Sequence, residues 1–249
     1  MKTSRSRRPH SAPFPDRINN RLLLALPKEK LDCLQPNLEL VDLPRGQILL
    51  RPNELIDYVY FPEEGMVSLV LHLEDESVIE VGLVGKEGMV GALAPLGATA
   101  MSGEARVQMA GSALRMRAGM LRTEVARNPD LMDLLLRYVQ ALFAQISQSV
   151  ACNGRHRLNE RMARWLLMAH DCVDGDELPL SHEFLATMLG VRRAGITVAV
   201  GQLREAGLID SRGGRFSILN RRGLEASGCG CYRAVNEQYE RLLSSPQPA

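Results

Sequence analysis

The segment 181–201 constrains the fold of this chain more than any other. Ser181 is a strong N-cap residue, and Gly190 can adopt the left-handed backbone that turns one helix sharply into the next. Small and apolar residues occupy the positions that would pack two such helices together: Leu185, Ala186, Leu189, Val191, Ile196, Ala199 and Leu203. Gly207 would end the second helix. This combination predicts a helix-turn-helix over about 181–206.

A β-hairpin is predicted directly after these helices. Residues 208–210 and 216–219 suit strands, and Gly213-Gly214 suits the two-residue turn between them. Seven arginines lie between 192 and 222, although the formal net charge of the whole chain is only +1. A helix-turn-helix with such a wing places its second helix in the major groove of DNA. We therefore predict that duplex DNA is contacted by Arg192, Arg193, Ala194, Thr197, Arg204, Arg212 and Arg215.

The N-terminal half is typical of an antiparallel β structure. Short β-branched or alternating runs recur between about 41 and 117, separated by turns such as Pro44-Arg45-Gly46, Glu63-Glu64-Gly65 and Gly111. Many short strands at close intervals indicate a β-roll or jelly roll. Glycines at every third position from 82 to 91 suit neither helix nor strand. This loop either packs tightly on the roll or brings backbone N–H groups to an anion, so we take as candidate pocket residues Gly85, Glu87, Gly88, Met89 and Val90.

A long helix is predicted from Pro129. Asn128 suits the N-cap and Pro129 the first helical position, and neither proline nor glycine follows until Gly154. About 25 helical residues span about 38 Å, more than a compact domain needs. The apolar stripe has near-heptad spacing, so the helix either packs along the roll or pairs with a second copy of itself. We predict a homodimer interface made by Leu131, Leu135, Tyr138, Leu142, Ile146 and Ser149.

Composition argues against several classes of protein. The longest apolar runs, such as 22–26, are far shorter than a membrane span, and no apolar segment follows the basic N-terminus as in a signal peptide. We therefore expect a cytoplasmic protein that does not contact a membrane. Five scattered cysteines fit neither a disulfide framework nor repeated zinc-ligand pairs, and Cys229 with Cys231 cannot fill a tetrahedral site. We expect no metal and no cofactor.

The chain resembles the Crp/Fnr family over nearly all of residues 20–224. The resemblance rests on the following segments: Pro44-Arg45-Gly46-Gln47-Ile48-Leu49, 59–67, 85–91, Asn128-Pro129-Asp130-Leu131 and the 185–190 turn. It implies a cyclic-nucleotide-binding-type β-roll, a long dimerisation helix and a winged helix-turn-helix. It also implies a cytoplasmic homodimer that binds a roughly palindromic operator, works with RNA polymerase, and uses Arg193 to read a guanine.

The sequence departs from the cyclic-AMP-responsive members of that family. In those members a Gly-Glu pair and an Arg-Ser pair further along the chain clamp the ribose and phosphate. Here Glu87 stands at the position of the glutamate, but Gly103 and Glu104 stand where the Arg-Ser pair would be. Because Glu104 would repel a phosphate, we predict that the roll does not respond to cyclic AMP and has either another small-molecule effector or none. Iron–sulfur members carry a cluster of cysteines near the N-terminus, where this chain has only Cys33. Haem-sensing members use a histidine of the roll, but His72 is a lone strand histidine, which is more typical of a structural residue. Ala194 and Val198 replace two polar base readers, so the operator should differ from the best-known consensus.

These observations predict an α+β fold with an N-terminal antiparallel β-roll, a long dimerisation helix and a C-terminal winged helix-turn-helix. We expect a flexible basic tail over 1–19, a sensor roll over 20–127, the helix over 128–154, and a DNA-binding domain with a helical extension over 155–249. We therefore expect a transcription regulator without enzymatic activity. One alternative is a cupin-like enzyme, but a cupin needs several metal ligands and His72 is a single one. The other is an interaction module that does not bind DNA, which would leave the arginine-rich wing without a role.

Overall fold

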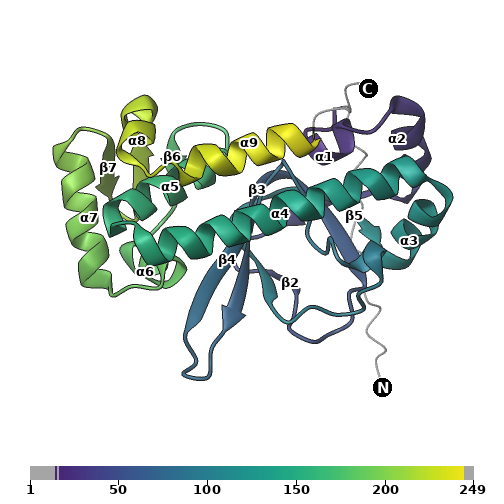
Figure 1. The fold of residues 1–249 in the computed structure, drawn as a ribbon, viewed down its shortest axis with the longest axis horizontal. Helices are drawn as coiled ribbons and strands as arrows, with labels where there is room; N and C mark the ends of the chain where they lie inside the picture. The colour runs from purple at the N-terminus through teal and green to yellow at the C-terminus, as the bar shows by residue number, and fades with distance from the viewer. Residues whose placement is uncertain (1–14, 16, 244–249) are drawn as a thin grey trace, which may run out of the picture.

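The computed structural model describes residue 15 and residues 17–243, so most of the predicted tail over 1–19 lies outside the described residues (Figure 1). Three short helical segments come first: α1 (Arg21–Leu24), α2 (Lys28–Leu34) and η1 (Gln35–Asn37). The elements of the roll are β1 (Glu39–Leu43), β2 (Ile48–Leu50), β3 (Tyr58–His72), β4 (Val78–Val84), η2 (Ala94–Leu96) and β5 (Glu104–Arg117). The strands form an antiparallel sheet in the order β1-β5-β3-β4, with β2 also paired to β5. The predicted antiparallel β-roll is confirmed.

Two of the predicted turns are bulges inside long strands, so our division into shorter strands was wrong there. β3 and β5 pair over most of their lengths, and the register shifts between Pro62 and Val67. Gly65 has a φ of 85°, and a Cβ there would come within 2.6 Å of the Met109 carbonyl oxygen. Gly111 lies opposite, close against the Glu64 backbone. Bulges bend a strand without ending its pairing, so both glycines let the two backbones approach and bend together.

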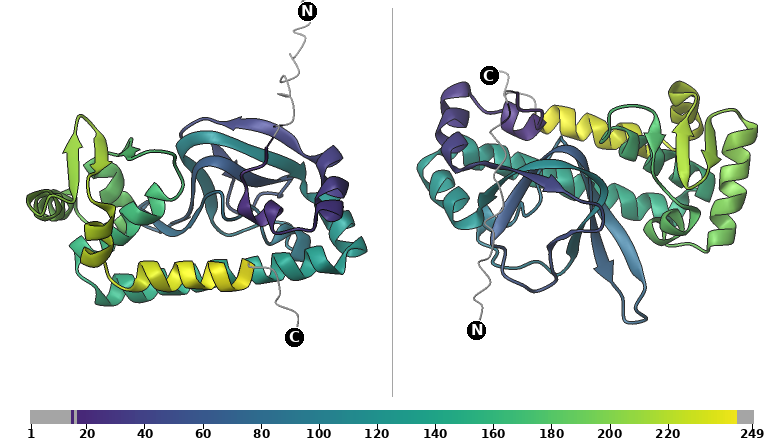
Figure 2. Two further views of the ribbon diagram at one scale, coloured as in Figure 1. Left: turned by 90° about the horizontal axis from the view of Figure 1, so that it is seen from above. Right: turned by 180° about the vertical axis from the view of Figure 1, so that it is seen from behind.

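The long helix lies along the roll and is partnered by the last helix of the chain. After α3 (Ala118–Arg127), α4 extends over Pro129–Arg155, and α9 (Cys231–Leu243) lies alongside it (Figures 1 and 2). Asn128 occupies the N-cap position of α4, but its side-chain oxygen accepts no hydrogen bond from the described residues, so the expected cap is not formed. Val235 and Tyr239 of α9 are buried in the same core as the roll and α4. The C-terminal helical extension therefore packs away from the helix-turn-helix.

The remaining elements build a second core beside the roll. They are α5 (Leu158–His170), β6 (Glu177–Leu178), α6 (His182–Leu189), α7 (Arg193–Glu205), β7 (Ile209–Arg212), β8 (Arg215–Ile218) and α8 (Arg221–Ser227). The three strands form an antiparallel sheet in the order β6-β8-β7. Met66, Leu83 and Met109 of the roll belong to this second core. The unit that carries the helix-turn-helix is thus docked on the roll, and the predicted α+β class is confirmed.

Among residues 15 and 17–243, no single helix is long and apolar enough to cross a membrane. In this part of the chain one pair of consecutive helices, α6 and α7, reaches that length and composition when taken together, but the two are bent by 108°.

Candidate nucleic-acid interface and sensor cavities

The helix-turn-helix forms where its capping and turn residues predict it. The Ser181 hydroxyl oxygen accepts a hydrogen bond of 3.1 Å from the Phe184 N–H, which satisfies a free donor in the first turn of α6. Gly190 ends α6 with φ 61° and ψ 43°, a left-handed conformation that costs glycine little. The Val191 N–H then donates to the Ala186 carbonyl at 2.9 Å and holds the corner. These local contacts lie at the corner where α6 and α7 meet with a bend of 108°.

One face of α7 is buried and the opposite face is free. Ile196, Ala199 and Leu203 are at most 3% exposed and pack α7 against the second core. The predicted contact residues at the start of the helix lie at its outer surface: Arg192, Arg193, Ala194 and Thr197. Val198, on the same side, is 63% exposed. An α-helix with this exposed face has the shape that enters a major groove.

The wing lies next to this face and carries two of the predicted arginines. Gly213 and Gly214 have φ values of 56° and 76°, as a tight two-residue hairpin turn requires. Arg212 and Arg215 leave β7 and β8 on either side of it, and both are exposed. The predicted strand–turn–strand is therefore confirmed.

Most of these arginines contact a carboxylate. Asp210 pairs with Arg204 at 3.3 Å and with Arg212 at 2.9 Å. Arg215 lies 3.0 Å from Glu177, and Arg193 lies 3.8 Å from Glu183. Exposed pairs of this kind contribute about 0–1 kcal/mol, so a phosphate can replace the carboxylate at little cost. The pairs orient the guanidinium groups but also reduce the local positive charge that the arginine count alone indicates.

His182 links the recognition helix to the wing, a role that the sequence analysis missed. Its Nδ1 lies 3.3 Å from the Thr197 hydroxyl, and its Nε2 lies 3.4 Å from the Ser211 hydroxyl. The ring also lies 5.7 Å from that of Phe216. Burial and then the charge of Arg193 lower the pKa of His182. Its position just after an N-cap serine was the only available signal, and it did not indicate contacts with residues 15 and 29 positions away.

The glycine loop packs tightly against α4. The Tyr138 hydroxyl donates to the Met89 carbonyl at 3.0 Å, and a Cβ on Gly88 would overlap the Tyr138 ring. Met89 and Val90 are each 1% exposed. The Gly85 N–H donates to the Glu87 carboxylate at 2.8 Å. Burial raises the pKa of Glu87, although this hydrogen bond acts to lower it. These contacts are those of the packed-turn alternative, since a carboxylate already occupies a backbone donor that an anion would need.

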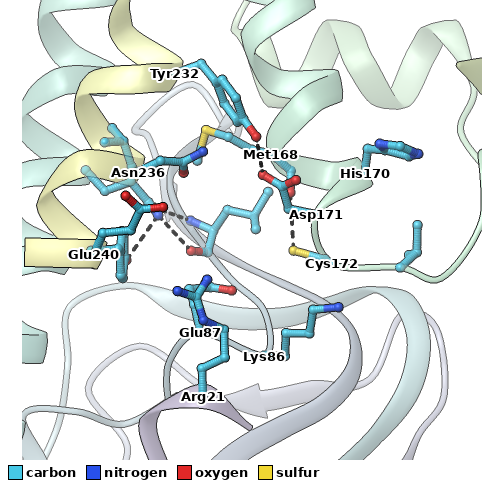
Figure 3. A pocket seen from close by; sticks show the side chains of 15 residues that line it. Arg21, Lys86, Glu87, Met168, His170, Asp171, Cys172, Tyr232, Asn236 and Glu240 are labelled. Carbon is cyan, nitrogen blue, oxygen red and sulfur yellow. Dashed lines mark hydrogen bonds between the residues drawn. The ribbon is translucent and has the colours of Figure 1, made fainter. Parts of the chain in front are cut away.

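A polar cavity of about 390 Å³ borders this loop, between the roll, α5 and α9 (Figure 3). Lys86, Glu87 and Arg21 lie on one side of it, and Asp171 and Tyr232 lie on the other. The Tyr232 hydroxyl donates to the Asp171 carboxylate at 2.7 Å. The cavity therefore brings together charges of both signs. Of the predicted pocket residues only Glu87 lines it.

A second cavity, of about 350 Å³, lies between the roll and α4 and is apolar. Its lining includes Leu69, Met89, Met101 and Ile146, and none of its lining residues is charged. Gly103, at the position where the sequence analysis expects the arginine of the cyclic-AMP-responsive members, also lines it.

Acidic and basic residues of the roll pair with one another. Glu104 contacts Arg106 at 2.6 Å and His72 at 3.3 Å. Arg115 pairs with Glu39 at 3.0 Å. Arg106 and Arg115 do not line either cavity.

Four of the six residues of the predicted dimer stripe on α4 are covered within one protomer. Leu131, Leu135, Tyr138 and Ser149 are at most 8% exposed because they face the roll, the glycine loop and α9 within one protomer. Leu142 and Ile146 are half-buried and line the apolar cavity. The exposed apolar residues of α4 follow a different seven-residue repeat: Leu136 (48%), Phe143 (70%) and Val150 (68%). Because α4 has two apolar faces, periodicity could not tell which one covers its own roll.

Comparison with known proteins agrees with this architecture. The family model of the cyclic nucleotide-binding domain matches residues 40–128, and that of the Crp-like helix-turn-helix domain matches residues 160–227. The transcriptional regulator SdrP of Thermus thermophilus is 27% identical in an alignment of 195 residues that covers 75% of this chain and 93% of SdrP. The global nitrogen regulator of Nostoc sp. is 26% identical in an alignment of 174 residues that covers 66% of this chain and 78% of the relative.

Solved structures share the fold. FixK2 of Bradyrhizobium japonicum superposes with a TM-score of 0.66 at 17% identity, covering 77% of this chain and 98% of FixK2. TTHA1359 of Thermus thermophilus, a transcriptional regulator of the CRP/FNR family, gives a TM-score of 0.61 at 23% identity, covering 76% of this chain and 97% of TTHA1359. The two family models, the curated relatives and the winged helix-turn-helix behind a β-roll agree, and the chain belongs to the Crp/Fnr family of transcriptional regulators.

Proposed function

We propose that this regulator acts as a homodimer on a palindromic operator, which α7 reads in the major groove while the β7–β8 wing contacts the backbone. The observation that carries the proposal is the exposed face of α7 beside the two wing arginines, over a fully packed helix-turn-helix core. In this scheme residues 20–127 form the sensor, 128–154 the dimer helix, and 155–249 the DNA-binding unit with its helical extension, of which α9 packs back on α4. The dimer works in the cytoplasm with RNA polymerase and catalyses no reaction.

The arginines of the two elements take different roles. Arg193 starts α7, is exposed, and forms a long ion pair of 3.8 Å with Glu183, so its planar guanidinium is available for a bidentate contact to guanine. Ala194 and Val198 present methyl groups nearby, which suit thymine methyls. Arg212 and Arg215 lie on the wing and bind phosphates, as do Arg192 and Arg204 at the two ends of α7.

The variant Arg193→Ala tests whether Arg193 reads a base, and Arg212→Ala on the wing is the matched control. Selection of operators by the wild type from random duplexes comes first. Arg193→Ala should then weaken specific binding by about 1–3 kcal/mol and relax preference at one base pair in each half-site. Arg212→Ala should weaken binding to all DNA sequences alike and reduce the salt dependence of binding by the amount expected for about one phosphate contact. Uniform weakening by Arg193→Ala would mark it as a phosphate contact, and unchanged binding by both variants would contradict the interface itself.

The dimer interface is best supported on the exposed apolar repeat of α4. Leu136, Phe143 and Val150 recur every seven residues along one side of the helix, the spacing at which two helices pair. Phe143→Glu would bury an unpaired charge in that contact, at a cost of several kcal/mol. Sedimentation should show a monomer for Phe143→Glu and a dimer for Met120→Glu, which adds the same charge at an exposed apolar site on α3. A tight dimer of Phe143→Glu would move the interface elsewhere.

The sensor roll is proposed not to respond to cyclic AMP. The cavity between the roll and α4 has no charged lining residue, and a buried cyclic phosphate needs a paired cation or several donors to replace its water. A small apolar effector suits this cavity better. Calorimetry with cyclic AMP should show no binding at micromolar concentration and no change in operator affinity. Micromolar binding coupled to tighter operator binding would contradict the proposal.

A further inference from the structure

Four metal-ligating side chains from two distant segments meet near the end of α4. Cys152 lies in the last turn of α4, and His156 is the residue at which that helix ends. Cys229 and Cys231 lie 73 or more residues later, in the turn between α8 and α9 and at the start of α9. The sequence analysis set the Cys229 and Cys231 pair aside because two ligands cannot complete a tetrahedral site. The structure overturns that reason, since folding adds a second pair to the first.

The spacing of the donor atoms is that of a single small ion. The Sγ atoms of Cys152 and Cys229 lie 3.5 Å apart, and Cys231 Sγ lies 3.4 Å from His156 Nδ1. All four donor atoms lie within 4.8 Å of one another. Ligands at about 2.3 Å for sulfur and about 2.0 Å for nitrogen around tetrahedral Zn²⁺ are about 3.5–3.8 Å apart. In an iron–sulfur cluster the four protein ligands are divided among two or four irons, and ligands on different irons lie further apart than ligands of a single ion.

The surroundings of the cluster are also those of a metal centre. The three cysteines are at most 8% exposed and form a small core of their own. Gln148 Nε2 donates to Cys231 Sγ at 3.0 Å, a second contact that orients a ligand. Arg164 is 4% exposed, its Nε has no hydrogen-bond partner among the described residues, and its charge acts on Cys152. A site with three thiolates and one dication carries a net negative charge, which this buried guanidinium would balance.

We propose that Cys152, His156, Cys229 and Cys231 bind one Zn²⁺ ion. Three thiolates and an imidazole favour zinc over the harder divalent ions. Four protein ligands leave no open position for substrate or water, so the site is structural rather than catalytic. The neutral His156 ring would bind through Nδ1, the nitrogen that faces Cys231.

Such an ion would fasten the DNA-binding unit to the dimer helix. One ligand pair ends α4, and the other begins α9, which lies back along α4 and buries Val235 and Tyr239 in the sensor core. Binding energy of a structural zinc is folding energy for the segments that it joins. The proposed site would therefore set how α5 and the helix-turn-helix leave the end of α4.

Zinc content and cobalt spectra of the full chain test the proposal. Protein purified under reducing conditions should contain about one zinc per chain by elemental analysis, because the four ligands form one closed site. Cys229→Ser and His156→Ala should lose most of it, whereas His156→Cys should keep it, since four cysteines also form a zinc site. Cys33→Ser and Cys172→Ser, which remove an exposed and a buried cysteine elsewhere, should keep the metal. Co²⁺ added to stripped protein should give the visible absorption of a tetrahedral thiolate site.

Further measurements use protein that keeps all four ligands, so they do not depend on the folding of a ligand variant. A chelator should lower the melting temperature of the wild type and of Cys172→Ser, and added Zn²⁺ should restore it. Gln148→Ala keeps all four ligands and should bind zinc about 10–100-fold more weakly. Metal-free reduced protein with no cobalt spectrum would overturn the proposal. So would a Cys152–Cys229 disulfide in protein from reducing conditions, or equal zinc loss in Cys172→Ser.

Discussion

Replacing Glu80 with glutamine should make the protein more stable above neutral pH. Glu80 lies on β4 of the roll, and its carboxylate accepts a hydrogen bond of 2.6 Å from the Trp165 indole of α5 and another from the Ser68 hydroxyl. It thus joins the β-roll to the unit that carries the helix-turn-helix. Burial of the carboxyl group raises the pKa of Glu80 from 4.5 to about 7, although both hydrogen bonds and the charge of Arg164 act in the opposite direction.

The sign and size of the effect follow from that pKa. Between pH 4.5 and 7 the folded protein binds more protons at this site than the unfolded chain. The free energy of unfolding should therefore fall as the pH rises through this range, and the loss is complete above about pH 7. A rise in pKa from 4.5 to about 7 corresponds to about 3 kcal/mol. This value is an upper limit, because Glu80 as a whole residue is only half-buried.

Denaturation by urea at a series of pH values from about 5 to 8 measures this difference. Glu80→Gln keeps an oxygen that can accept from Trp165 but cannot ionise, so its stability relative to wild type should increase across the series. Glu29→Gln removes the same charge from the exposed surface of α2 and serves as control. A difference between Glu80→Gln and wild type that does not change with pH would refute the reasoning, because it would show that Glu80 does not titrate in this range.

Three further changes test other contacts. Gly190→Ala should cost about 1–2 kcal/mol of stability, because alanine is strained at φ 61° and its Cβ would lie 3.2 Å from Ile79; an unchanged melting temperature would contradict this. Tyr138→Phe should cost about 1 kcal/mol in urea denaturation, because the Met89 carbonyl loses its 3.0 Å donor; a neutral effect would mean that water replaces it. The lowered pKa of His182 favours its neutral ring, so stability should fall as the pH drops below 6.5. An NMR titration that gives His182 a pKa of 6.5 or above would refute this.

The sequence by itself determined the parts of this protein that depend on short-range chemistry. Ser181, Gly190 and the Gly213-Gly214 pair act within a few residues, through a cap, a left-handed turn and a tight hairpin, and each forms as predicted. The long helix follows from an uninterrupted apolar period, and the roll from repeated strands and turns. The family motifs lie in these same local elements, so the family could also be identified before the fold was known.

Only the tertiary structure decided which surfaces and side chains meet. Two faces of α4 are apolar, and the packing of the roll and α9 determines that Tyr138 is buried and Phe143 is exposed. His182 reaches the wing, Glu80 reaches Trp165, and Cys152 reaches Cys229, over separations of 29, 85 and 77 residues. Contacts at such separations arise from the docking of whole elements, whose geometry the spacing of residues along one chain does not encode.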